Sequence, residues 1–382
     1  MSRPVLAIAG GGPVGLALAC ACIGFDVRVV EAGAATTPKK EFDVRVYALS
    51  PGSREFLQAI GAWRRIDAER VAPVRRMEVF GEGDAQLSFA PRPGEALAWI
   101  VEAGRLSQAL EEQAASLAHV DIRRGLQASG FSAAAAGGAI ELEGGEPLEA
   151  SLIVGADGPD SRLRAGLGIP SHELAYGEAA IVANFDTERE HGAVARQWFR
   201  PDGVLAWLPL PGRRISIVWS APLACADELA ALDAAAFERR VTEAGAGALG
   251  NLKLISPRAR FPLRLIRVPH PVAPGVALVG DAAHAVHPLA GQGVNLGFQD
   301  ARVLSEVLAQ RSPLERPGDL RVLRRYARAR QEDVAAMQLV THGLDRLFGA
   351  RAPAIRAMRN LGLRIVETQS WAKAALARQA MR

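Results

Sequence analysis

The stretch VALVGDAAHAVHPLAGQGVNLG, residues 276–297, decides the fold. Its first four residues are apolar, the pattern of a strand buried on both faces, and Asp281 stands where that strand should end. A turn with Gly291 and Gly293 follows, and apolar residues then recur at helical spacing. The first N–H groups of that helix have no partner inside it and form a weakly positive end. The stretch therefore predicts a site for a flat or polar ligand, because glycines let a ligand approach the backbone.

A second motif of this kind opens the chain. Residues 5–9 are an apolar strand, and a glycine-rich turn, a helix and a second strand that ends at Glu31 complete a βαβ unit. This is the dinucleotide-binding fingerprint in its required context. Gly10 makes the turn, Gly12 admits a pyrophosphate and Gly15 lets the helix pack on the strand. Glu31 would accept hydrogen bonds from an adenosine ribose, but the motif alone does not separate FAD from NAD.

The middle of the chain has a different period. Residues 179–220 contain alternating segments separated by Pro/Gly turns, which predicts antiparallel strands. These strands carry Trp198, Trp207 and Trp219. Because parallel-type segments lie on both sides, we expect a second domain inserted in the first, capped by a helix at 229–244.

The complete pattern predicts an α/β fold with three parts. These are a doubly wound, Rossmann-like dinucleotide-binding domain, an inserted antiparallel-sheet domain, and a C-terminal helical region. A chain of 382 residues is too long for one core, which agrees with several lobes. The expected ranges are 1–73, 102–177 and 267–310 for the first domain, 74–101 and 178–266 for the inserted domain, and 311–382 for the helical region.

Composition excludes several classes of protein. The net charge is only +4 and no zinc-finger or RRM motif accompanies the arginines, so no nucleic-acid partner is expected. Cys20, Cys22 and Cys225 form neither a CxxC pair nor a metal-ligand spacing, which indicates a reducing cytoplasm, no metal site, and a packing role for Cys20 and Cys22. No stretch reads as a transmembrane span.

Positive charge is concentrated toward the C-terminal end. Residues 311–382 contain 15 Lys or Arg and 6 Asp or Glu, so the rest of the chain is mildly acidic. Such a region suggests contact with an anionic membrane surface or with an acidic partner. Solvated helix faces are an equally good interpretation.

Three ordered motifs resemble those of the single-component FAD-dependent aromatic hydroxylases. They are Gly10-x-Gly12-x-x-Gly15, Gly155-Ala-Asp157-Gly158-x-x-Ser161-x-x-Arg164, and the segment 280–295. A narrower resemblance is to the ubiquinone-biosynthesis hydroxylases of the UbiH, UbiF and VisC type, through Asp43-x-Arg45-x-x-Ala48-Leu49-Ser50, Phe199-x-Pro-x-Gly203 and His287-Pro-Leu-Ala-Gly-Gln-Gly. It spans nearly the whole chain and implies a fold like that of p-hydroxybenzoate hydroxylase, in which the inserted antiparallel sheet is the substrate domain.

The resemblance also implies which residues hold FAD. Asp281 would hold the ribityl or pyrophosphate region, and the backbone of 291–295 would lie along the pyrimidine edge of the flavin. The helix that starts there would favour the negative charge of the reduced ring. Asp157 and Arg164 are expected to be largely structural. The full set expected at the cofactor is Gly10, Gly12, Pro13, Val14, Gly15, Glu31, Arg45, Arg105, Asp157, Asp281, Pro288, Gly291, Gln292, Gly293, Val294 and Asn295.

The chemistry that the resemblance implies belongs to the cofactor. NAD(P)H reduces FAD, O2 adds at C4a, and the hydroperoxide passes a hydroxyl group to an electron-rich ring. The three tryptophans of the inserted sheet would cover the flavin and line the substrate pocket, although about half of such tryptophans are ordinary core residues. No catalytic base is evident. His287 and Pro288 are nearest the flavin by motif, whereas His284 is expected to be packed.

We therefore expect a monooxygenase that hydroxylates a polyprenylated phenol or quinol in ubiquinone biosynthesis, in the cytoplasm or peripheral on the inner face of the membrane. Two alternatives stay open. A hydroxylase of a small soluble aromatic acid would need a cationic anchor, for which Arg196 or Arg213 could serve. A non-catalytic FAD-binding subunit of a quinone-biosynthesis complex would bind FAD without phenol-stimulated NAD(P)H oxidation.

Overall fold

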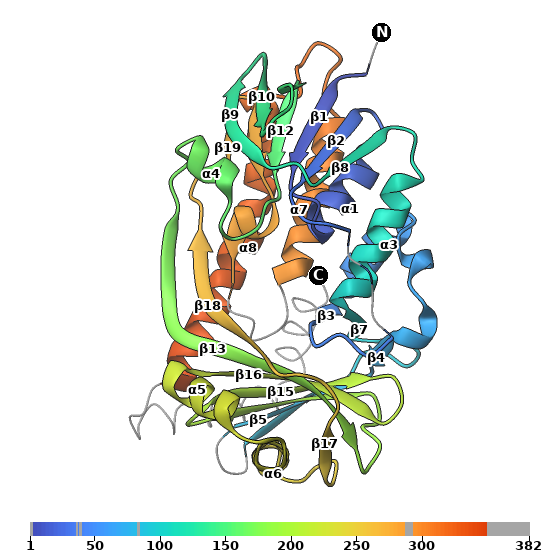
Figure 1. Cartoon of the computed structure of the whole chain (residues 1–382), viewed down its shortest axis with the longest axis vertical. Helices are drawn as coiled ribbons and strands as arrows, with labels where there is room; N and C mark the ends of the chain where they lie inside the picture. Colours follow the sequence, from blue (N-terminus) through green and yellow to red (C-terminus); the bar gives the residue numbers. More distant parts are fainter. Residues whose placement is uncertain (1–2, 36, 38–39, 82–84, 287–292, 350–382) are drawn as a thin grey trace.

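The computed structural model describes residues 3–35, 37, 40–81, 85–286 and 293–349. A six-stranded, mainly parallel sheet forms one end of the molecule, and a nine-stranded, mainly antiparallel sheet forms the other (Figure 1). The long strands β13 (His172–Thr187) and β18 (Ala259–Arg267) pair with each other and run from one end toward the other (Figure 1).

The six-stranded sheet brings the three glycine motifs together. Its order is β19-β20-β12-β1-β2-β8, and β1 pairs in parallel with β2 and with β12, which pairs in parallel with β20. The carboxyl ends of β1, β12 and β20, after which Gly10, Asp157 and Asp281 follow, therefore meet at one edge. The strand bounds are β1 (Val5–Ala9), β2 (Asp26–Glu31), β8 (Val120–Arg124), β12 (Leu152–Gly155), β19 (Val272–Ala273) and β20 (Val276–Leu278).

Helices bury their apolar sides against this sheet. The main core includes Leu16, Leu106, Phe298 and Leu323, one from each of four helices. Cys20 also lies in this core, and burial raises the pKa of its thiol to about 12, which confirms a packing role. The helices are α1 (Pro13–Ala21), α2 (Pro51–Ala59), α3 (Ala103–Ala115), α4 (Arg162–Gly166), α7 (Gly293–Ala309) and α8 (Leu320–Gly349), and residues 350–382 lie outside the described ranges.

The antiparallel strands expected at 179–220 are present in the nine-stranded sheet. Its order is β21-β18-β13-β16-β15-β14-β5-β6, with β17 paired to β13. The remaining bounds are β5 (Arg76–Phe80), β6 (Gln86–Phe89), β14 (Val194–Arg200), β15 (Gly203–Leu210), β16 (Arg214–Pro222), β17 (Leu252–Leu254) and β21 (His284–Ala285).

The helical cap on this sheet differs from the expectation of one helix at 229–244. Two helices, α5 (Leu223–Ala231) and α6 (Ala234–Ala244), occupy the region. The reason is Asp233, whose carboxylate accepts a hydrogen bond from the backbone N–H of Ala236 at 2.7 Å. An Asp in this position caps the start of a new helix and so interrupts the old one.

Two smaller sheets complete the described structure. One contains β9 (Ala128–Ala134), β10 (Gly137–Leu142) and β11 (Leu148–Ala150), and the other β3 (Val46–Leu49), β4 (Ala72–Val74) and β7 (Ala98–Glu102). Strand β7 lies between β3 and β4 in this sheet. The domain boundaries expected at 73/74 and 101/102 fall within β4 and β7, and they stay a prediction. Within the described ranges, no helix combines the length and apolar character needed to cross a bilayer.

Candidate functional site

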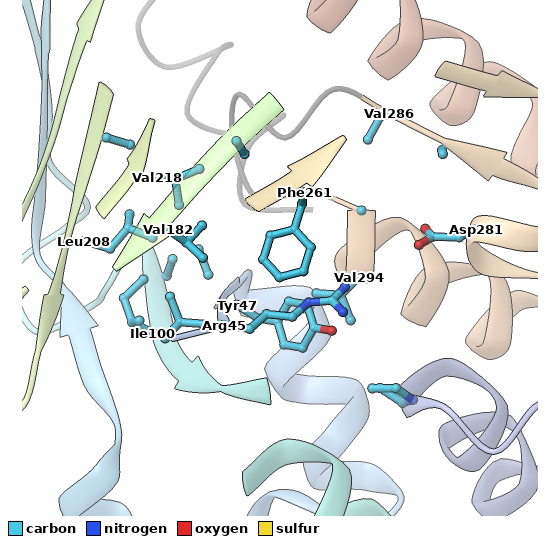
Figure 2. A pocket seen from close by; sticks show the side chains of 18 of the residues that line it. Arg45, Tyr47, Ile100, Val182, Leu208, Val218, Phe261, Asp281, Val286 and Val294 are labelled. Atoms are coloured by element: carbon cyan, nitrogen blue, oxygen red, sulfur yellow. The ribbon is translucent and has the colours of Figure 1, made fainter. Parts of the chain in front are cut away.

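A cavity of about 740 Å³ lies between the glycine motifs and the nine-stranded sheet. Figure 2 shows Asp281 on one side of it and the apolar side chains of Val182 and Leu208 on the opposite side. Phe261 and Tyr47 lie between them (Figure 2). The cavity therefore has a polar side at the edge of the parallel sheet and an apolar side on the antiparallel sheet.

The first glycine loop has two glycines that the fold needs and one that leaves space. Gly10 has φ +110°, and a Cβ on it would lie 2.3 Å from the carbonyl oxygen of Ala156. A Cβ on Gly15 would lie 2.1 Å from the Gly10 carbonyl oxygen. Gly12, in contrast, has no atom of the described residues within 4 Å of its would-be Cβ and lines the cavity together with Pro13 and Val14. This open backbone fits a pyrophosphate at the start of α1.

Glu31 is held beside this loop. Its carboxylate accepts hydrogen bonds from the backbone N–H groups of Gly11 at 2.7 Å and Gly33 at 2.8 Å. It is not among the residues that line the cavity. These contacts fix the acid at the end of β2, where a ribose would be expected in a dinucleotide fold, and its role toward a ribose stays a prediction.

The second motif contains a buried carboxylate oxygen without a partner. Asp157 Oδ2 accepts a hydrogen bond from Leu163 N–H at 3.0 Å, whereas Oδ1 is buried and unpaired within the described residues. The buried Arg164 donates to the carbonyl oxygens of Ala282 at 2.9 Å and Pro159 at 2.7 Å, so it joins the second motif to the third. Asp157 itself does not line the cavity, unlike its neighbours Ala156 and Gly158, so its contacts agree with the largely structural role expected for it, and its place in the cofactor set stays a prediction.

Asp281 is the charged group of the third motif in the cavity lining. Burial raises the pKa of its carboxyl above the usual range, although the nearby His284 and Arg45 act in the opposite direction. Arg45 also lines the cavity, with its guanidinium carbon 5.4 Å from the centre of the Tyr47 ring and 5.9 Å from that of Phe261 (Figure 2). A desolvated carboxyl that faces a cavity is suited to bind ligand hydroxyl groups.

The start of α7 borders the same space. Gly293 and Val294 line the cavity, and within the part of the chain that the structure describes a Cβ on Gly293 would meet only Asp281 Oδ1, at 3.9 Å. Asn295 has a different task, since its side chain accepts from Ser50 N–H at 3.0 Å and donates to the Ala48 carbonyl at 2.8 Å. It therefore fixes the first turn of α7 to the β3–α2 connection. His287, Pro288, Gly291 and Gln292 lie outside the described residues.

Three arginines named from the sequence do not line the cavity. Arg105 lies in the first turn of α3. Arg196 forms an ion pair with Glu78 at 3.1 Å, and Arg213 lies near Glu190 at 3.6 Å on the surface. The two candidate anchors for a small aromatic acid are therefore placed elsewhere.

The expectation that Trp198, Trp207 and Trp219 line the pocket is wrong. All three belong to the buried core between the nine-stranded sheet and helices α5 and α6. The reason is the period of two along each strand: their neighbours Gln197, Ala206, Leu208 and Val218 line the cavity, so the tryptophans lie on the opposite face. The alternation that predicted the strands shows that each tryptophan and its neighbours lie on opposite faces, but it does not show which face borders the cavity.

A buried charge network behind the third motif was not predicted. Asp300 is 0% exposed, and its carboxylate contacts His284 Nε2 at 2.6 Å, Gly280 N–H at 2.9 Å and Arg330 Nε at 2.7 Å. It thereby supports the turn at Gly280, where φ is +60°. The packed role expected for His284 is confirmed. The sequence signal was weak, since Asp300 and Arg330 look like ordinary polar positions on helices.

Comparison with known proteins gives both a family and relatives. The family described as FAD binding domain matches residues 2–341. The chain is 36% identical over 372 residues to 3-demethoxyubiquinol 3-hydroxylase of Escherichia coli, covering 95% of this chain and 94% of that protein. It is 33% identical over 380 residues to ubiquinone hydroxylase UbiL of Rhodospirillum rubrum, covering 98% and 88%. It is 34% identical over 418 residues to ubiquinone biosynthesis monooxygenase COQ6 of Xenopus tropicalis, covering 93% and 88%.

Solved structures are similar in fold. The structure of PqsL of P. aeruginosa in complex with 2-aminobenzoylacetate has a TM-score of 0.78 at 23% identity, covering 95% of this chain and 99% of that one. The p-nitrophenol 4-monooxygenase PnpA of Pseudomonas putida has a TM-score of 0.78 at 17% identity, covering 100% and 98%. They confirm the expected α/β fold of the p-hydroxybenzoate-hydroxylase type.

Proposed function

The chain belongs to the family described as FAD binding domain, and on that premise we propose that it hydroxylates the ring of a polyprenylated phenol or quinol in ubiquinone biosynthesis. It is an FAD-dependent aromatic hydroxylase, and NAD(P)H and O2 are its co-substrates. The names of its relatives support the choice of substrate, since they include a demethoxyubiquinol hydroxylase and a ubiquinone hydroxylase.

One observation carries the proposal. A single cavity is bordered by the backbone of Gly12 and Gly293 and by Asp281 on one side and by an apolar sheet on the other. Bound FAD supplies the electron transfer and oxygen activation, chemistry that no side chain provides. Gly12 and the N-terminus of α1 would receive the pyrophosphate, and the N-terminus of α7 would favour negative charge on the ring. Asp281 would bind ribityl hydroxyls, and the apolar wall excludes water from the reacting ring.

The apolar side of the cavity, which we call the wall and which strands β4 to β7 and β13 to β16 form, is also suited to bind the prenyl chain. Each buried methylene-sized group contributes about 0.8 kcal/mol, so one five-carbon unit is enough to raise affinity more than tenfold. The apolar residues that strands β4 to β7 and β13 to β16 contribute to the lining are Val74, Met77, Phe89, Ala98, Ile100, Ala180, Val182, Ala195, Ala206, Leu208 and Val218. A small aromatic acid would not meet the two anchors expected for it, because Arg196 and Arg213 do not line this space. The arginines in the described lining are Arg45 and Arg264, and Arg264 is paired with Asp160 at 2.8 Å, so Arg45 is the cation left for a carboxylate.

Substrate-stimulated NAD(P)H oxidation tests the proposal. We expect a prenylated phenol to stimulate oxidation and to be bound more than tenfold more tightly than the same phenol without its prenyl group. A preference for benzoate-type acids would favour the small-acid hydroxylase. Bound FAD without stimulation by any phenol would favour a non-catalytic subunit of a quinone-biosynthesis complex. Deletion of the gene should cause a precursor that lacks one ring hydroxyl to accumulate, which mass spectrometry detects.

Contact with an anionic membrane surface through the basic C-terminal region is part of the proposal. Arg321, Arg324 and Arg328 are exposed and share one face of α8, and the exposed Leu339 continues that stripe. Basic residues near anionic lipid contribute about 1 kcal/mol each. Sedimentation with anionic vesicles should therefore show binding at low salt that weakens at high salt, and no binding at either salt concentration would remove this part. A protein so placed would be cytoplasmic and peripheral.

A further inference from the structure

Gln197 differs from the rest of the sheet wall. It lies on β14 and lines the cavity, flanked in register by Ala206 on β15 and Val79 on β5. Among the described residues that β5, β6 and β13 to β16 contribute to the lining, it is the only one with a polar side chain. Its neighbours on the wall, such as Ala195 and Leu208, cannot hydrogen-bond to it.

The Gln197 side chain is almost removed from bulk water. The residue is 6% exposed, and within the described residues its amide makes no hydrogen bond. An amide in an apolar environment is costly when its donors and acceptor stay unpaired. Two other polar side chains of β14, Arg196 and Arg200, each form an ion pair with a carboxylate. The Gln197 amide has no comparable contact with a described residue.

The amide is therefore free to bind a ligand. It carries two N–H donors and one carbonyl acceptor, so it can donate to a methoxyl oxygen and can donate to or accept from a hydroxyl group. An amide that meets an oxygen in the ligand regains the hydrogen bond that it lost on burial, whereas a ligand with hydrogen at that position leaves it unpaired. Such a site discriminates by the penalty it imposes on the wrong ligand.

We propose that the Gln197 amide hydrogen-bonds a hydroxyl or methoxyl oxygen on the substrate ring and makes the enzyme select rings that carry this oxygen. The inference rests on the proposed function and adds a specificity-determining residue to it. The apolar neighbours bind the ring through burial of apolar surface, so they do not distinguish oxygenated from deoxygenated rings. Gln197 supplies the difference between the two.

The test uses the FAD-loaded enzyme and two prenylated phenols that differ only in a second ring oxygen, present as hydroxyl or methoxyl in one and replaced by hydrogen in the other. Dissociation constants are measured by quenching of protein fluorescence, without turnover, and KM is measured separately. Gln197→Met keeps the length of the side chain and removes the hydrogen bond. Leu208→Met, on the neighbouring strand, is the matched control because it changes the wall without changing its hydrogen bonding.

We expect the wild-type enzyme to prefer the oxygenated ring by about tenfold or more, and Gln197→Met to reduce this preference to within about threefold. Leu208→Met should change both dissociation constants by the same factor, and Gln197→Asn should retain part of the preference. Retention of the full preference in Gln197→Met, or its absence in the wild-type enzyme, would overturn the assignment. Because the wild-type measurement stands by itself, a variant that does not fold still leaves a result. If no phenol stimulates NAD(P)H oxidation, the proposed function fails, and the assignment fails with it.

Discussion

The two sides of the cavity are built in different ways. The polar side is made by backbone at the ends of β1, β12 and β20, where glycines and an acid occur in short contiguous motifs. The apolar side is made by alternate side chains of β5, β6 and β13 to β16, which lie far apart in the sequence. A change on the first side should act on backbone geometry and cofactor affinity, and one on the second should act on packing or substrate affinity according to the face it occupies.

Truncation of a tryptophan in the core between the nine-stranded sheet and helices α5 and α6 should have the largest effect on stability. Trp207 is 1% exposed and packs against Trp198 with ring centres 4.7 Å apart. Trp207→Ala should lower the free energy of unfolding by about 3–5 kcal/mol, because it leaves a cavity in a packed core. The adjacent Leu208 faces the open cavity, so Leu208→Ala should cost less and should weaken substrate binding more. Urea unfolding compares the two variants, and the reverse order of stability would contradict the assignment of faces.

The glycine loop should respond almost as strongly at Gly10. Gly10→Ala combines a left-handed backbone angle with a collision against the Ala156 carbonyl, so we expect a loss of about 3 kcal/mol in the free energy of unfolding. The apoprotein is the right sample for this measurement, because it separates folding from cofactor affinity. If the variant unfolded at the same urea midpoint as the wild-type protein, the loop would be able to relax around the added methyl group.

Gly12→Ala is the matched variant for Gly10→Ala, because it should change FAD affinity without changing the stability of the apoprotein. Its φ of −73° suits alanine, and no atom of the described residues lies within 4 Å of the added Cβ. Gly12→Ala should therefore change the stability of the apoprotein by less than about 0.5 kcal/mol. It should weaken FAD binding about tenfold, because the methyl group takes space that the cofactor needs. Titration of the apoprotein with FAD measures this, and unchanged affinity would place the pyrophosphate elsewhere.

The smallest effect concerns the network behind Asp281. Burial alone would favour the neutral His284 ring, but the Asp300 carboxylate outweighs it and raises the pKa of His284, with Arg330 opposing and Asp281 assisting. A raised folded-state pKa means that the stability contributed by His284 is complete below its unfolded pKa of about 6.5 and is lost as the pH rises through the folded-state pKa. The Tm difference between the wild-type protein and His284→Asn should therefore shrink between neutral and alkaline pH. A difference that stays constant from below pH 6.5 to alkaline pH would contradict a titration of His284 with a raised pKa in this range.

The sequence was a good guide to one side of the cavity and a poor guide to the other. Gly10, Gly12, Gly15 and Asp281 could be identified because each motif needs particular residues at fixed short spacing for backbone reasons. The residues of the wall could not be identified in this way. The sequence analysis assigned the three tryptophans to the pocket because aromatic side chains often line such sites, but they lie on the opposite face of the sheet. Gln197 had no local signal, since a glutamine in a strand becomes unusual only when its surroundings are known.

What the sequence by itself determined is the cofactor class and the architecture, since the glycine motifs specify turns that few backbones can make and nearly the whole chain follows the family pattern. What only the tertiary structure decided is which residues face the cavity. Trp207 and Gln197 belong to neighbouring strands of one sheet, yet the first stabilises a core and the second lines the cavity. The physical reason is that a β-strand sends successive side chains to opposite faces, and only the packing of the sheet against α5 and α6 determines which face is buried.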